Sequence, residues 1–149
     1  MFFLAVSGAP CNIHPVYVLT AVTAPVSVTR TGSKYQASSR ISFRIKETRS
    51  AVIVSVEPGV LEHVRGHQLI AQRVARSSSG RITAAGSTAA QARAGLARSI
   101  RDLTADQNRE LLREEHVYDT VTENGAAQSQ GPSYGMPGGS DVQDRSCTQ

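Results

Sequence analysis

The clearest pattern in the chain is a strict alternation of apolar and polar side chains over residues 41–47, ISFRIKE. Successive side chains of a strand point to opposite faces of a sheet, so these apolar residues share one buried face while their neighbours face water. Residues 16–23 and 26–30 are rich in β-branched residues, are broken at Pro25, and predict two further strands. Residues 51–57, AVIVSVE, alternate in the same way, so we expect an antiparallel hairpin with 41–47.

The spacing of apolar residues becomes helical in the second half of the chain. We expect a helix over residues 60–76, a loop of small residues over 77–88, and a long helix over 89–123. The apolar stripe of the long helix consists of Leu96, Ile100, Leu103, Leu111 and Tyr118. Strands followed by helices favour an α+β fold, with a small antiparallel β-sheet from the N-terminal half packed on two α-helices.

The length of 149 residues suits a single domain. We expect this domain to span residues 13–125, with Asn124 and Gly125 capping the long helix at its C-terminal end. Residues 126–149 are rich in glycine, proline and serine and predict an irregular tail. Residues 1–12 are expected to be either the remnant of a secretory signal or a loose N-terminus, because their apolar run is short and no positive charge precedes it.

The two cysteines, Cys11 and Cys147, lie near opposite ends of the sequence. Their spacing fits neither a zinc knuckle nor a redox motif. They are either a disulfide that ties the ends together in an oxidising compartment or two free thiols. Together with the N-terminal run, the disulfide interpretation predicts a secreted or periplasmic location.

The chain is basic, with a net charge of +4, and arginine supplies 14 of its 16 basic residues. The arginines are spread along the sequence and no aromatic residues are interleaved with them for base stacking. We therefore interpret them as a solvated surface and expect no nucleic-acid partner. No apolar run is long enough to cross a membrane as a helix. The oligomeric state is not indicated by the sequence.

Two histidines stand four residues apart in the first expected helix, in LEHVRGHQ. Positions i and i+4 share a helix face, so His63 and His67 can reach one metal ion, and a zinc peptidase helix has this spacing in H-E-x-x-H. Here Val64 occupies the position of the glutamate that acts as the general base. Two buried histidines without a metal have the same geometry. We interpret His14 and His116 as surface or rim residues.

A second motif lies at the end of the long helix, where Y-D-x-x-T-x-x-G is formed by Tyr118, Asp119, Thr122 and Gly125. Together with H-x-x-G-H upstream, it resembles a bacterial family, the domain of unknown function numbered 922, described as a predicted secreted zinc-dependent protease. The resemblance covers residues 38–132. It implies a zincin-like domain in which strands are followed by a helix carrying H-E-x-G-H and a long helix ending in Y-D-x-x-T-x-H-G.

The resemblance implies that His63 and His67 are zinc ligands and that Gly66 and the second motif support them. Two positions depart from the family pattern: Val64 replaces the catalytic glutamate, so no catalytic residue is assigned, and Asn124 replaces the histidine of the second motif. Asp119 is then the expected third ligand, with His116 and Glu123 as the alternatives.

Two functions remain open at this stage. One is a secreted or periplasmic zinc metallopeptidase that acts on a peptide or protein substrate and is impaired by the loss of its base. The other is a non-catalytic pseudoenzyme of the cell envelope that uses the same scaffold to bind a protein partner.

Overall fold

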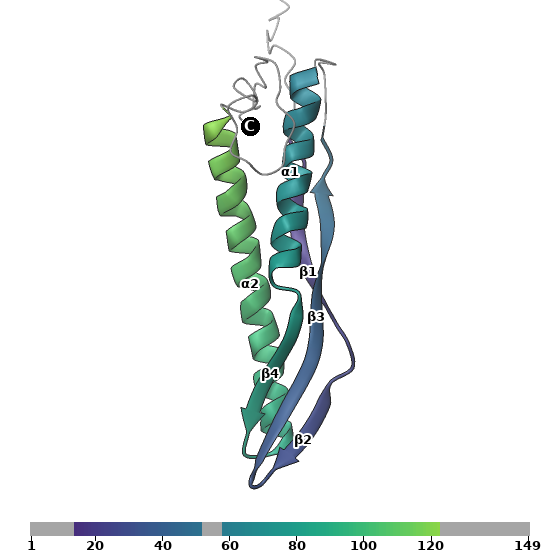
Figure 1. The fold of residues 1–149 in the computed structure, drawn as a ribbon, viewed down its shortest axis with the longest axis vertical. Coiled ribbons are helices and arrows are strands. Elements are labelled where there is room, and N and C mark those ends of the chain that lie inside the picture. The colour runs from purple at the N-terminus through teal and green to yellow at the C-terminus, as the bar shows by residue number, and fades with distance from the viewer. Residues whose placement is uncertain (1–13, 52–57, 123–149) are drawn as a thin grey trace, which may run out of the picture.

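The computed structural model describes residues 14–51 and 58–122 of the chain. It contains four strands and two helices, arranged as an elongated molecule with a sheet on one side and helices on the other (Figure 1). The elements are β1 (Val16–Thr23), β2 (Ser27–Thr31), β3 (Lys34–Arg49), α1 (Pro58–Ser77), β4 (Gly80–Gly86) and α2 (Ala89–Val121). The α+β fold class, with a small antiparallel sheet packed on two helices of which the second is long, is confirmed.

The sheet is built around β3, whose 16 residues pair with all three other strands. β1 is antiparallel to residues 41–49 of β3 and β2 to residues 34–38, and the two follow one another along the same edge. β4 is antiparallel to residues 35–41 on the opposite edge. The turn between β2 and β3 contains Gly32, which has a φ of 65° and needs no Cβ to be accommodated there.

α2 runs along the whole sheet, with α1 beside one half of it and β4 beside the other (Figure 1). Its first turn is capped by Thr88, whose hydroxyl accepts a hydrogen bond from the Gln91 amide. Asn108 ties the middle of α2 to β1, because its side-chain amide accepts from the Leu19 N–H and donates to the Leu19 carbonyl. α1 and α2 are antiparallel, so the start of α1 lies next to the end of α2.

Two apolar clusters lie between the sheet and the helices. The larger one joins β1, α1 and α2 through Leu19, Ile70, Ala71, Val74, Ala75, Leu111 and Tyr118. The smaller one joins β3 to the first half of α2 through Ala37, Ala92 and Leu96. Tyr118 closes the larger cluster at the end where the helices meet. The antiparallel packing of the two helices brings polar residues of both together just beyond it.

The predicted strands 16–23 and 26–30 are confirmed as β1 and β2, and the helices begin and end close to the expected residues. The expected loop over 77–88 is wrong, because β4 occupies most of it. β3 is also longer than the predicted strand 41–47. Residues 52–57 of the expected hairpin, the cap at Asn124 and Gly125, and both cysteines lie outside the described residues. Neither of the described helices is long and apolar enough to cross a membrane.

Candidate metal centre

Two histidines lie one helical turn apart on the face of α1 that is turned inward. His63 is 0% exposed and His67 is 2% exposed. Their Nε2 atoms are 3.3 Å apart, so the two rings converge on one point. Ile70 and Val74 follow the two histidines on the same face of α1 and belong to the larger apolar cluster, which explains why this face of the helix is buried.

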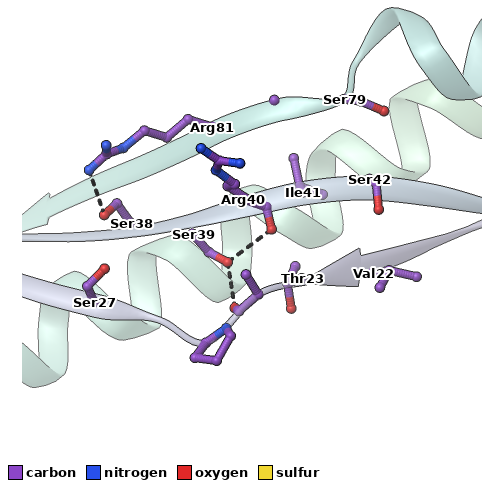
Figure 2. A pocket seen from close by; sticks show the side chains of 13 residues that line it. Val22, Thr23, Ser27, Ser38, Ser39, Arg40, Ile41, Ser42, Ser79 and Arg81 are labelled. Atoms are coloured by element: carbon purple, nitrogen blue, oxygen red, sulfur yellow. Dashed lines mark hydrogen bonds between the residues drawn. The ribbon is translucent and has the colours of Figure 1, made fainter.

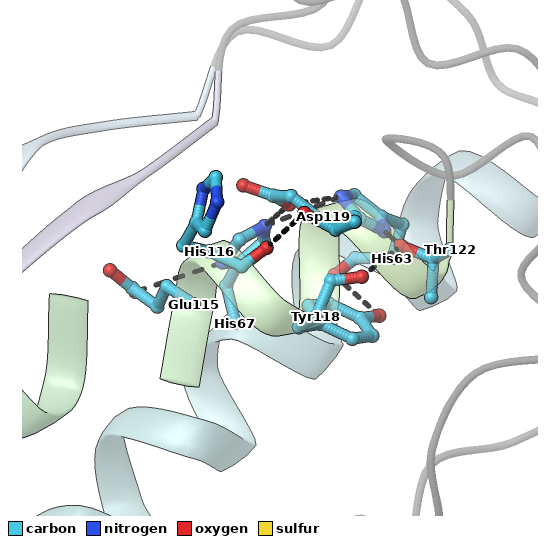
Figure 3. A network of polar contacts seen from close by, with 8 residues as sticks. His63, His67, Glu115, His116, Tyr118, Asp119 and Thr122 are labelled. Atoms are coloured by element: carbon cyan, nitrogen blue, oxygen red, sulfur yellow. Dashed lines mark hydrogen bonds and ion pairs between the residues drawn. The ribbon is translucent and has the colours of Figure 1, made fainter. Parts of the chain in front are cut away.

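α2 supplies a carboxylate at the point where the two histidines converge (Figure 3). The Oδ1 atom of Asp119 lies 3.1 Å from Nε2 of His63 and 2.8 Å from Nε2 of His67. The antiparallel packing of α1 and α2 brings these groups together although they are more than fifty residues apart in the sequence. Three donor atoms therefore form a small triangle at one end of the core.

A fourth donor comes from the segment before β1. A ring nitrogen of His14 belongs to a set with His63, His67 and Asp119 in which the donor atoms all lie within 4.8 Å of one another. The His14 ring is 4.8 Å from the His63 ring and 4.9 Å from the His67 ring, measured between centroids. Arg49 fixes this segment by donating a hydrogen bond of 3.1 Å to the His14 carbonyl. These four residues could hold a metal ion.

Tyr118 and Thr122 hold the His63 ring from the side away from the triangle. The Tyr118 ring stacks on His63 with centroids 4.7 Å apart, and its hydroxyl donates to the His63 carbonyl. The Thr122 hydroxyl donates to the Tyr118 carbonyl at 2.6 Å and lies 3.2 Å from Nδ1 of His63. Because the one hydroxyl hydrogen is already used, the Thr122 oxygen accepts from an Nδ1–H of His63. This leaves the lone pair of His63 on Nε2, directed at the triangle.

His67 also has a polar neighbour beside its Nδ1 atom, on the side of the ring away from Asp119. Oε1 of Glu115 lies 3.7 Å from Nδ1 of His67, and the Glu115 side chain is 12% exposed. The separation is too long for a direct hydrogen bond, but the negative charge favours a hydrogen on Nδ1 and leaves Nε2 facing Asp119. Thr122 and Glu115 thus lie beside the Nδ1 atoms of the two imidazoles, while both Nε2 atoms point at Asp119. Histidines that bind metals are usually held in this way by a second neighbour.

With a hydrogen on Nδ1 of each imidazole, Nε2 of His63, Nε2 of His67 and Oδ1 of Asp119 direct lone pairs at the same small volume, and a cation placed between them would stabilise this arrangement. In the protein without metal, a proton can take this role. Burial alone would lower the pKa of His67, but the carboxylates of Asp119 and Glu115 outweigh it and raise the pKa to about 9. Burial alone would raise the pKa of Asp119, but its bonds to the two histidines hold the pKa well below its usual range.

His14 behaves in the opposite way. Burial, followed by electrostatic interactions with His67 and His63, lowers the pKa of His14 to about 4. His14 is therefore neutral near pH 7, which is the form of histidine that binds metal ions.

The separations in the triangle fit a metal ion. Around a tetrahedral zinc ion with bonds of about 2.0–2.1 Å, neighbouring donor atoms are about 3.3 Å apart. The three observed separations are 2.8, 3.1 and 3.3 Å. Histidine nitrogens with a carboxylate oxygen are also an ordinary donor set for zinc. The three separations are therefore compatible with a bound metal ion.

The remaining predicted residues fall into three groups. Gly66 is buried between the two histidines on α1, Val64 is half-buried, and Tyr118 and Thr122 are fully buried beside the donor group. Asn124, Gly125, Cys11 and Cys147 lie outside the described residues. His116 is exposed on α2, as expected for a surface residue.

Sequence reasoning missed two residues of this centre. The sequence places His14 at the surface or rim, and the residue is indeed half-buried, but its membership of the donor group was not predicted. No spacing motif connects it with the other histidines, and the pairing of β1 with β3 helps to bring it there. Glu115 was missed as well. Its position one helical turn before Asp119 was the available signal, because residues i and i+4 share a helix face.

Comparisons of the chain with known protein families, with curated proteins and with solved structures find no match.

Proposed function

We propose that this protein binds one zinc ion through His63, His67, Asp119 and His14, and that the ion has a structural role. One observation carries the proposal: three donor atoms from two helices converge at 2.8–3.3 Å, and both helix histidines are oriented from outside so that Nε2 faces the centre. When bound, the ion would join the segment before β1 to the meeting ends of α1 and α2.

A structural role agrees better with this arrangement than a hydrolytic one. Structural zinc sites have four protein ligands, whereas catalytic sites use three and keep one position for water. His14 supplies a fourth donor here. A hydrolytic site also needs a general base, and Val64 cannot accept a proton. Glu115 does not replace it, because its carboxylate lies beside Nδ1 of His67, on the side away from Asp119.

The test is the uptake of zinc and its effect on folding. The purified full chain, stripped with a chelator and dialysed against zinc, is expected to retain one zinc per chain. Thermal unfolding should then occur at a higher temperature than in the chelator, because a ligand that binds only the folded state stabilises it by about 2.7 kcal/mol at a hundred times its dissociation constant. No retained zinc and no change in unfolding temperature would contradict the proposal.

Matched variants locate the ion. Asp119→Asn keeps the shape of the side chain but removes its charge, and it should abolish the zinc-dependent rise in unfolding temperature. His116→Gln changes an exposed histidine three residues earlier on the same helix and should leave that rise unchanged. Equal effects of the two variants would show that zinc binds elsewhere.

The second candidate function is zinc-dependent peptide hydrolysis. It is supported by the two motifs that resemble the predicted secreted protease family, with His63, His67 and Asp119 as ligands and water in place of His14. Val64→Glu would restore the missing base. A variant that holds one zinc and hydrolyses a peptide library, when the wild type does not, would favour an impaired peptidase. A zinc-loaded variant without activity would argue against it.

A secreted or periplasmic location and a partner in the cell envelope remain part of the proposal for either function. Expression of the gene with its native upstream sequence, followed by fractionation of the cells, tests the location.

A further inference from the structure

The face of the sheet turned away from the helices is basic. Phe43 and Ile45 of β3 pack against the larger apolar cluster, so the residues between and beside them point to the opposite face. Arg40, Arg44 and Lys46 of β3 are exposed there. Both helices lie on the other side of the sheet (Figure 1).

The cations on this face are not neutralised by acidic side chains of the described residues. Arg40 of β3 is directly opposite Arg81 of β4. Like charges placed opposite one another on neighbouring strands destabilise a sheet. The ion pairs within the described parts of the chain lie on or between the two helices. An external anion would relieve the repulsion between the two arginines.

A depression of about 990 Å³ lies beside the two arginines (Figure 2). Its lining includes the hydroxyl-bearing residues Ser38 and Ser42. Arg81 donates a hydrogen bond of 3.1 Å to the Ser38 hydroxyl, which holds its guanidinium on this face. Guanidinium and hydroxyl groups together are suited to the oxygens of a phosphate.

Exposed valines lie next to the basic row. Val18 and Val22 of β1 are 39% and 40% exposed, and they are paired with Lys46 and Ser42 of β3. The face therefore combines cations with apolar side chains, which matches an anionic lipid surface with its phosphates and underlying hydrocarbon. It fits nucleic acid less well, because the aromatic residues Tyr17, Tyr35 and Phe43 of the sheet pack toward the helices and cannot stack on bases.

We propose that this face of the sheet, defined by Arg40, Arg44, Lys46 and Arg81 with Val18 and Val22, docks the protein on the surface of an anionic membrane. The arginines bind lipid phosphates, with Arg40 and Arg81 sharing one headgroup at the depression. The valines rest against the interface without crossing it. This inference is independent of the metal centre, which lies between the helices.

The test is co-sedimentation of the full chain with vesicles. Binding is expected to vesicles of phosphatidylcholine with about one third phosphatidylglycerol, not to pure phosphatidylcholine, and it should fall steeply between 0.1 and 0.5 M salt as charges are screened. The triple variant Arg40→Gln, Arg44→Gln and Arg81→Gln should bind of the order of a hundredfold more weakly, since each basic residue near an anionic surface contributes about fivefold.

The matched control changes three exposed arginines of α2, as Arg93→Gln, Arg98→Gln and Arg101→Gln. It removes the same net charge and should lose far less binding than the sheet variant. Equal losses would show a general charge effect and overturn the assignment to the sheet face. Tighter binding to duplex DNA than to the anionic vesicles, lost in the same sheet variant, would assign the face to nucleic acid instead. Circular dichroism of both variants checks that they fold.

Discussion

At the scale of single residues, the candidate metal centre depends on which nitrogen of each histidine carries a hydrogen. His63 is directed by Thr122, whose hydroxyl has already given its hydrogen to the Tyr118 carbonyl. His67 is directed by the charge of Glu115. Without these neighbours, the imidazoles would lack the groups that favour a hydrogen on Nδ1 and a lone pair on Nε2. The candidate metal centre therefore depends on Thr122 and Glu115, which orient the imidazoles, as well as on the four candidate ligands.

Thr122→Val tests the role of this hydroxyl. Valine has nearly the same shape but cannot accept the Nδ1–H of His63, so we expect the affinity for zinc to fall by about 10- to 100-fold. The dissociation constant is measured by competition with a chromophoric chelator. Thr120→Val is the matched control, because Thr120 is exposed and, among the described residues, its hydroxyl donates to a carbonyl of its own helix, that of His116. Equal affinities for wild type and Thr122→Val would contradict the account.

At the scale of elements, α2 connects both ends of the molecule. Its first half packs on β4 and β3, and its last turns carry Glu115, Tyr118, Asp119 and Thr122 to α1. The junction between β4 and α2 is tight. A Cβ added at Gly86 would lie 2.5 Å from the Ala92 nitrogen and 2.9 Å from the Gln91 carbonyl carbon. These are backbone atoms that cannot move without shifting the helix.

Two glycine-to-alanine substitutions are expected to change the free energy of unfolding in opposite directions, because the space around the two glycines differs. Gly86→Ala should lower the free energy of unfolding by about 1–3 kcal/mol, as overpacking does in well-packed regions. Gly95→Ala lies inside α2, where the added Cβ would be 3.4 Å from the Ala84 Cβ, an ordinary contact. It should raise the free energy of unfolding by up to about 1 kcal/mol through helix propensity. Urea unfolding of both variants measures the difference, and a stabilising Gly86→Ala would contradict the tight junction.

The elements with strong local patterns were predictable. The alternation around Phe43 and the stripe through Leu96, Leu111 and Tyr118 each identify an element without tertiary information. β4 was missed because GRITAAG contains only Ile82 as a strongly strand-forming apolar residue. It forms a strand because β3 offers a free edge and because Ile82 and Ala84 pack on the small cluster with Leu96. Such tertiary contacts are not visible in a local pattern.

At the scale of the whole molecule, the candidate centre combines local and long-range features. The pair His63 and His67 was predictable from its spacing, and Asp119 followed from the resemblance of the second motif. His14 could not be predicted, because no local pattern links it to the centre. The pairing of β1 with β3 and the hydrogen bond from Arg49 position the segment that carries it. The fourth donor, which separates a closed structural site from an open one, is thus a property of the assembled fold.

The pH dependence of stability without metal reports on the same assembly. His67 has a pKa of about 9 in the folded protein against 6.5 ordinarily, so its stabilising contribution is complete below pH 6.5 and is lost as the pH rises through about 9. His14 has a pKa of about 4, so the unfolded chain binds more protons between pH 6.5 and 4, and stability falls as the pH falls through this range. We expect the free energy of unfolding in a chelator to be highest near pH 6.5. Denaturant unfolding between pH 4 and 9 measures it, and stability that increases steadily to pH 9 would contradict the assignment.

The central claim is that His14, His63, His67 and Asp119 bind one zinc ion and leave no position for water. X-ray absorption spectroscopy of the zinc-loaded full chain tests it most directly, because it counts the imidazole rings around the metal. The account predicts four nitrogen and oxygen donors at about 2.0–2.1 Å, three of them imidazoles, and the loss of one imidazole in His14→Gln. Two imidazoles with bound water in the wild type would contradict the closed site, and a chain that takes up no zinc would contradict metal binding altogether.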